Sequence, residues 1–198
     1  MILNNAISAL KTVIHDIGCE SCDLKYVPLQ DHHTCQFCHG KCMGIEFGGK
    51  QACICSSSVP LFSARVKLSD LFDAPLKSDK TRVAAAGALT VVSGFLMLNR
   101  KISPCSPCDF DNCRLDLIKR CSGLQVCVLG SNIVGLNQVE SVEDADLVIV
   151  TGDSIVYMDT LIKIDSLTEV GKNILFVGPE WSGVSTLLNL DHWCPYGQ

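Results

Sequence analysis

The stretch from Cys19 to Cys55 constrains this chain more than any other, because it holds seven of the thirteen cysteines. Four of the seven form two Cys-x-x-Cys pairs, Cys19 with Cys22 and Cys35 with Cys38, and twelve residues separate the pairs. Two residues between paired thiols allow both sulfurs to reach one cation. The two pairs therefore offer the four thiolates that a tetrahedral zinc ion or an iron–sulfur cluster requires.

Three further thiols follow in the same stretch. Cys42 comes four residues after the second pair, and three thiolates in such close succession also suit an iron–sulfur cluster. Gly48-Gly49 predicts a tight hairpin turn between two strands. Cys53 and Cys55 lie two apart on the second of these strands, so we expect their side chains to face the same side. The structural alternative is that these thiols are small buried hydrophobic groups.

The expected loop at 30–41, between the strand signal at 23–29 and the hairpin, also carries His32, His33 and His39. The segment 35–39 matches the attachment pattern of c-type haem, with His39 as the axial ligand, but that chemistry normally requires export. Residues 1–16 have the periodicity of an amphipathic helix, with no basic leader and no cleavage pattern. We therefore expect a cytoplasmic protein, in which an odd number of cysteines indicates free thiols or metal ligands rather than disulfides.

A second cysteine group lies in the middle of the chain. Cys105, Cys108 and Cys113 fall within nine residues, beside two prolines and at the expected start of a helix. A helix N-terminus favours the thiolate form, so these residues suit metal or cluster ligation, and reactive thiols without a metal are the alternative. The fourth ligand stays open between Cys121, Cys194 and a member of the first group.

Charge and hydropathy argue against two classes of partner. The net charge of −5 lacks the basic footprint of a nucleic-acid-binding protein. Residues 83–99 carry no charge, but they are fewer than the ~20 that a bilayer core requires and they include polar side chains. We expect these residues to form a helix buried inside the protein, and we expect no membrane partner.

The second half of the chain has the pattern of a parallel sheet. Three continuous apolar runs, residues 126–129, 147–150 and 174–177, each end at a turn, and helical stretches separate the later two. The turns carry the residues of the expected ligand-binding crevice, which are Gly130, Ser131, Thr151, Gly152, Asp153, Ser154, Gly178 and Pro179. Ligands of open parallel sheets bind outside these strand ends, although Asp153 and Ser154 are also good helix caps.

Several of these segments resemble the heavy-metal chelation family. Leu147–Ser154, with Asp146 before it, is similar to the family's signature strand and turn, and Phe176–Pro179 is similar to its next strand. Leu68–Leu71 and Val83–Leu89 resemble the helix pair of its small domain. The resemblance implies an enolase-N-like α+β domain, then a Rossmann-like domain, with a cleft between them. The short segment between Gly130 and Asp146 indicates that a strand and helix of that family are missing here.

The chain is thus expected to be an α/β protein. The Pro-punctuated loop at 103–108 divides it into an N-terminal α+β domain, residues 1–102, and a small parallel α/β domain, residues 103–198. The preferred hypothesis is a protein that binds zinc or an iron–sulfur cluster and carries, senses or inserts metal. The metal ligands are expected among Cys19, Cys22, Cys35, Cys38, Cys42, Cys105, Cys108 and Cys113.

Two other functional classes stay open. The first is a cluster-dependent redox or cofactor-assembly enzyme, whose substrate lies in the cleft near Asp153 and Glu180. The second is an interaction module in which zinc only holds the fold together. Either a small molecule or a protein could occupy the cleft, and an exposed cysteine group could join two copies as a homodimer.

Overall fold

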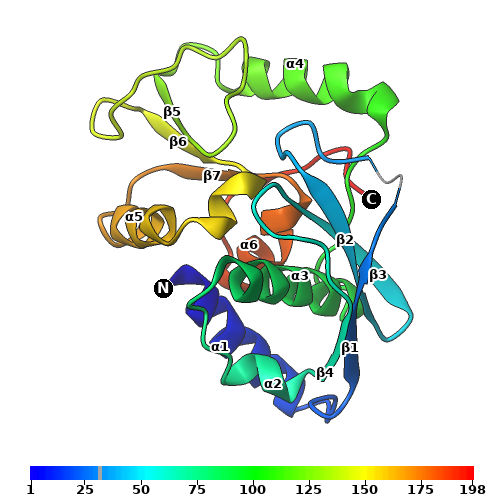
Figure 1. Ribbon diagram of the computed structural model, residues 1–198. Coiled ribbons are helices and arrows are strands. Elements are labelled where there is room, and N and C mark those ends of the chain that lie inside the picture. Colours follow the sequence, from blue (N-terminus) through cyan, green and yellow to red (C-terminus); the bar gives the residue numbers. More distant parts are fainter. Residues whose placement is uncertain (31–32) are drawn as a thin grey trace.

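The fold is known from a computed structural model that describes residues 1–30 and 33–198, so His32 lies outside the described residues. The described residues form two four-stranded sheets (Figure 1). The first sheet is antiparallel and belongs to the N-terminal half, and the second is parallel and belongs to the C-terminal half. The predicted fold class, an α+β part followed by a parallel α/β part, is confirmed.

The antiparallel sheet has the strand order β3-β2-β1-β4. Its strands are β1 (Asp23–Pro28), β2 (Lys41–Phe47), β3 (Lys50–Ser56) and β4 (Ala64–Lys67). The turn between β2 and β3 is the predicted two-residue hairpin, because Gly48 and its neighbour have positive φ angles of 54° and 80°. The short edge strand β4 has no clear signal in the sequence.

Helices cover one face of this sheet. They are α1 (Ile2–His15), α2 (Ser69–Phe72) and α3 (Asp79–Phe95). Helix α3 begins earlier than the sequence suggests, because Ser78 and Thr81 cap it reciprocally. The middle of α3 is buried, as predicted for the uncharged residues 83–99. Among the described residues, no helix is long and apolar enough to cross a membrane.

The parallel sheet has the strand order β5-β6-β7-β8. Its strands are β5 (Val126–Leu129), β6 (Leu147–Val150), β7 (Ile174–Val177) and β8 (His192–Trp193). The first three match the apolar runs of the sequence. Strand β8 was not expected, because two residues without an apolar run give no periodic signal.

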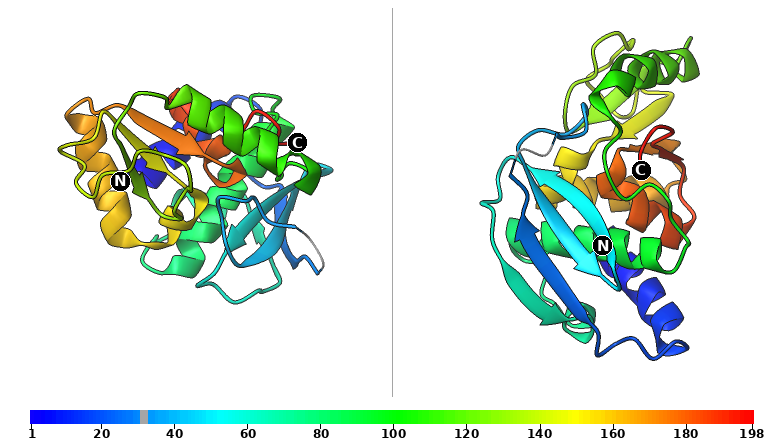
Figure 2. Two further views of the ribbon diagram at one scale, coloured as in Figure 1. Left: turned by 90° about the horizontal axis from the view of Figure 1, so that it is seen from above. Right: turned by 90° about the vertical axis from the view of Figure 1, so that its right-hand side faces the viewer.

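Helices and short turns connect these strands. The helices are α4 (Phe110–Arg120), α5 (Met158–Glu169) and α6 (Ser182–Leu188). The 3₁₀ turns are η1 (Pro107–Asp109), η2 (Gly152–Val156) and η3 (Pro179–Trp181). The connection from β5 to β6 contains no helix, and Gln138 makes only an isolated bridge to β5. Figures 1 and 2 place α4 and α2 at opposite ends of the molecule, with α3 and α6 between them.

Helices α3 and α6 join the two halves. A Cβ atom on Gly183 of α6 would lie only 2.4 Å from the backbone nitrogen of Thr90 in α3, so glycine permits this close contact between the helices. A single hydrophobic cluster includes residues from both sheets and from α1, α3 and α6. Because the two halves share this core, the division of the chain into two domains at residue 103 stays a prediction.

Candidate metal centre

The hairpin of β2 and β3 brings three thiols together. Its register places Cys42 directly opposite Cys55, and Cys53 opposite Gly44. Successive side chains of a strand alternate between faces, so the three cysteines share one face, as predicted for Cys53 and Cys55. Their Sγ atoms all lie within 4.8 Å of one another, and each residue is at most 3% exposed. We call Cys42, Cys53 and Cys55 the hairpin triad.

Cys38 lies beside the triad on residues 33–40, which precede β2 and which we call the covering loop. Its thiol contacts the thiol of Cys55 and lies 3.4 Å from the carbonyl oxygen of the same residue. It also lies 3.2 Å from Oδ1 of Asp153, which follows β6 in the other half of the protein. The backbone N–H of His39 donates to the same carboxylate at 3.1 Å. Asp153 therefore fixes the covering loop over the triad.

Hydrogen bonds between the thiols make Cys55 the acidic member of the group. The thiols of Cys38, Cys42 and Cys53 donate to it, and these bonds hold the pKa of Cys55 well below its usual range. The pKa of Cys53 is raised, because its bonds to Cys42 and Cys55 favour the thiol form. The bond with Cys53 lowers the pKa of Cys42, but the bond with Cys55 and burial outweigh it and raise this pKa to about 12. Three thiols that donate to one sulfur already converge on it, as the ligands of a metal must, and binding of a metal would displace their protons.

A buried carboxyl group lies next to this cluster. Glu180 follows β7 in the turn η3 and is 1% exposed. Its own backbone N–H and the thiol of Cys38 act as donors toward its carboxyl group, but neither makes a well-formed hydrogen bond with it. Burial, followed by the negative charge of Cys55, raises the pKa of Glu180 well above its usual range. Gly152 and Gly178 make room for it, because a Cβ atom on either would lie 2.7 Å from Oε2. Burial of a carboxyl group that has neither a cation nor a well-formed hydrogen bond costs free energy, and such groups often have a functional role.

The members of the second cysteine group in the sequence differ in their exposure to solvent. Cys105 and Cys113 are buried, whereas Cys108 is exposed and its thiol lies 3.1 Å from Oγ of Ser106. Cys194, after β8, is close enough to both buried thiols that their negative charge raises its pKa, although burial is the larger cause of a value of about 12. Cys194 itself is half-buried, whereas its neighbour Pro195 and the terminal Gln198 are exposed.

The two Cys-x-x-Cys pairs do not meet. Cys19 and Cys22 lie in the turn before β1, beside the start of α2, and Cys22 is exposed. The other pair follows the opposite end of β1, and a six-residue strand spans roughly 20 Å. Cys35 is buried together with Cys38, but its thiol lies next to Gly178 rather than in the hairpin triad. The spacing in the sequence could not reveal that a strand separates the pairs.

The residues of the predicted crevice mostly contact one another. Thr151, Gly152, Ser154, Gly178 and Pro179 are buried. The backbone N–H of Ser131 donates to Oγ1 of Thr151 at 2.7 Å, and its hydroxyl group donates to Asp153. Gly130, which is exposed, has a φ angle of 112° and a Cβ atom there would clash with Thr151. The covering loop with Cys38 thus occupies the strand ends where a ligand was expected.

The sequence prediction missed Cys53 and Cys55 as ligands, although a signal was present. A two-residue turn at Gly48-Gly49 fixes the hairpin register, and this register alone pairs position 42 with position 55. Glu180 carried no such signal, because its proximity to the thiols depends on the packing of the two halves.

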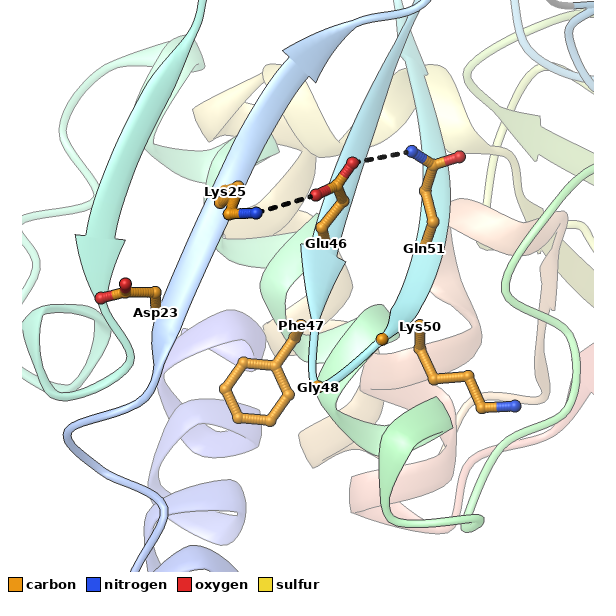
Figure 3. A pocket seen from close by; sticks show the side chains of 8 residues that line it. Asp23, Lys25, Glu46, Phe47, Gly48, Lys50 and Gln51 are labelled. Atoms are coloured by element: carbon orange, nitrogen blue, oxygen red, sulfur yellow. Dashed lines mark hydrogen bonds and ion pairs between the residues drawn. The ribbon is translucent and has the colours of Figure 1, made fainter.

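A separate hollow lies at the other end of the hairpin (Figure 3). Its volume is about 400 Å³, and Lys25, Glu46, Gln51 and the hairpin turn line it. Glu46 already pairs with Lys25 at 3.5 Å and accepts from Gln51 at 3.4 Å. The residues that line this hollow include no thiol, so it is separate from the hairpin triad.

The triad is a buried group of thiols whose geometry is compatible with metal binding, and Cys38 and the carboxyl group of Glu180 lie next to it. No protein-family model, no curated protein and no solved structure matches this chain.

Proposed function

We propose that this protein binds one thiophilic metal ion, zinc in the first instance, through the hairpin triad and Cys38, and that it carries, senses or inserts this ion. The observation that supports the proposal is the spacing of the triad, whose sulfurs all lie within 4.8 Å of one another. Tetrahedral geometry with Zn–S bonds of about 2.3 Å places the sulfurs about 3.8 Å apart. Only a small closure of the triad around an ion is then required, and Cys38, whose thiol contacts that of Cys55, must move toward Cys42 and Cys53 to complete the site.

The spacing favours a single ion over an iron–sulfur cluster at these residues. A cluster distributes its thiolates over several iron atoms, which keeps the sulfurs further apart than they are around one ion. The four thiolates and the complete burial correspond to a closed zinc site, without the open position that catalytic zinc keeps. We therefore place the enzymatic alternative second.

The fourth ligand supports exchange of the ion rather than permanent storage. The triad lies on a regular hairpin, whereas Cys38 lies on the covering loop and its thiol has an alternative partner in Asp153 at 3.2 Å. When its sulfur takes up a proton from solvent, Cys38 can leave the metal and donate again to Asp153, which opens one coordination position without unfolding the hairpin. Its detachment would be the first step of release to a partner.

The arrangement also supports our proposal that the chain is a distant relative of the heavy-metal chelation family. That resemblance implies a small α+β part, a parallel α/β part and metal handling at their junction. The triad comes from the first part, and Asp153 and Glu180 come from the second.

The test is metal content and transfer in matched variants. Zinc analysis of the purified reduced protein should give one zinc that depends on Cys53, so Cys53→Ser should lose it. Cys127→Ser, a buried cysteine whose thiol faces the carbonyl of Glu140, is the control and should keep it. A Cys53→Ser protein with undiminished zinc would contradict the proposal.

The rate of transfer to a chromophoric chelator separates a carrier from a structural zinc site. We expect Cys38→Ser to release zinc at least tenfold faster than the wild type, because only three thiolates then remain. If zinc leaves both proteins only as fast as they unfold, the ion holds the fold together and the protein is an interaction module.

A further inference from the structure

A second group of four cysteines lies beside the first. Its members are Cys35, Cys105, Cys113 and Cys194, and they come from four separate segments. The thiol of Cys35 lies near Gly178, where a Cβ atom would be 3.6 Å from its Sγ atom. Burial is the main cause that raises the pKa of each of these thiols. Neighbouring thiols within the group raise it further in Cys35, Cys113 and Cys194, whereas the neighbouring thiol that acts on Cys105 is Cys108.

Backbone contacts hold the four segments in place. The N–H of Cys53 donates to the carbonyl of Ile102 at 2.9 Å, which fixes the segment before Cys105 against the hairpin. Ser103 and Gln198 then exchange hydrogen bonds of 2.6 and 3.0 Å, which bring the segment after Cys194 to the same place.

The other two segments meet at the start of α4 and beside β8. The side-chain amide of Gln36 donates to the carbonyl of Phe110 at 2.6 Å, next to Cys113 in the same helix. The N–H of Gly178 donates to the carbonyl of Trp193 at 3.1 Å, which joins the neighbourhood of Cys35 to that of Cys194. These hydrogen bonds bring together the backbone segments that carry the four thiols.

N–H groups point toward these sulfurs. The backbone N–H groups of Phe37 and Gly197 donate to Cys35 and Cys194, and the side chains of Trp193 and Gln36 donate toward Cys113. The indole Nε1 of Trp193 is buried and otherwise has no hydrogen-bond partner among the described residues. N–H donors of this kind stabilise thiolates that bind metal, and they tune iron–sulfur clusters.

The spacing of this group differs from that of the hairpin triad. Among the described residues, the triad is the one set of three or more such ligands whose atoms all lie within 4.8 Å. The four sulfurs of the second group are therefore too far apart to close around one ion without rearrangement. A cluster accommodates wider spacing, because its four thiolates are shared between two or four iron atoms.

We propose that Cys35, Cys105, Cys113 and Cys194 hold an iron–sulfur cluster, adjacent to the metal ion of the hairpin triad. The carboxyl group of Glu180 is adjacent to both groups, because a Cβ atom on Gly178 would lie 2.7 Å from its Oε2 atom and 3.6 Å from Sγ of Cys35, and the thiol of Cys38 acts as a donor toward it. The cluster site is independent of the zinc site, since the two sets share no ligand.

The exposed Cys108 gives a sharp test of this assignment. The sequence motif assigns Cys108 to the second site and leaves Cys194 optional, whereas our proposal reverses their roles, because Cys108 is exposed and Cys194 is half-buried. The full-length protein should be purified without oxygen and reconstituted with ferrous iron and sulfide. The measurements are iron, acid-labile sulfide, zinc and the visible absorbance of each variant.

We expect the wild type and Cys108→Ser to contain iron and sulfide in equal amounts and to be coloured. Cys194→Ser should lose most of the iron, sulfide and colour but keep its zinc, which also shows that this variant is folded. Cys53→Ser should lose zinc and keep the cluster, so failure of either site is recognised separately. A second zinc in place of iron, no iron after reconstitution, or loss of the cluster in Cys108→Ser would each overturn the proposal.

Discussion

Tyr26 shows how one buried polar group connects the sheet to the helix layer. Its hydroxyl group donates to the carbonyl of Ala84 in α3 at 3.1 Å, and the residue is 5% exposed. Burial raises the pKa of Tyr26 well above its usual range. The neutral form is therefore favoured in the folded protein.

This shift predicts a loss of stability at high pH. Below about pH 10 the tyrosine is neutral in both states, and above that pH the unfolded chain loses its proton while the folded protein keeps it. The free energy of unfolding should then fall by up to about 1.4 kcal/mol per pH unit from this residue alone. Tyr26→Phe should cost about 1 kcal/mol at neutral pH and remove this part of the decline.

Urea unfolding of the wild type and the variant between neutral pH and pH 11 measures the difference. Tyr157, which is 52% exposed, provides the control, and Tyr157→Phe should decline with pH like the wild type. Equal slopes for the wild type and Tyr26→Phe would show that the buried hydroxyl group does not cause the decline.

At the scale of elements, the covering loop depends on one glycine. Gly40 has a φ angle of 114°, and a Cβ atom there would lie 2.1 Å from the carbonyl oxygen of Ser56 at the end of β3. Both the backbone conformation and the close contact require glycine. This position allows the loop to bend so that Cys38 reaches the hairpin triad.

We expect Gly40→Ala to displace the loop and to weaken zinc binding at least tenfold, because Cys38 then moves away from the ion. Gly49→Ala is the matched control, since Gly49 also has a positive φ angle of 80° but no atom lies within 4 Å of its Cβ position. Competition with a zinc chelator measures both affinities. Equal losses in the two variants would mean that backbone strain, not the loop contact, causes the effect.

The elements that could be predicted from the sequence are those with local signals. The hairpin follows from Gly48-Gly49, and the strands β5, β6 and β7 follow from their apolar runs. Strands β4 and β8 are too short for a periodic pattern, and their pairing depends on partners that are distant in the sequence. The same limit applies to the site, because only the hairpin register is local, whereas Asp153 and Glu180 reach the thiols through packing of the whole chain.

For the whole molecule, metal binding should join the two halves. The covering loop is fixed both by the triad through Cys38 and by Asp153 in the second half. A ligand that binds only the folded state stabilises it, by about 2.7 kcal/mol at a hundred times its dissociation constant. Removal of the metal should therefore lower the melting temperature and expose the loop.

Calorimetry and limited proteolysis before and after treatment with a chelator measure this effect. We expect a lower melting temperature and new cleavage within residues 33–40 after treatment. Cys53→Ser, which is expected to lack the ion, should show no change on chelation. A chelator effect of the same size in that variant would assign the stabilisation to another site.

The two thiol groups differ in how far their members lie apart along the chain. The first group spans residues 38–55, so it is complete as soon as one loop and one hairpin have formed. The second group spans residues 35–194 and exists only when nearly the whole chain is in place. Local contacts form early in folding and distant ones form late. If both proposed sites are filled, the hairpin would therefore capture its ion during synthesis, while the C-terminal half is still being made, and the cluster would be inserted only into the finished protein.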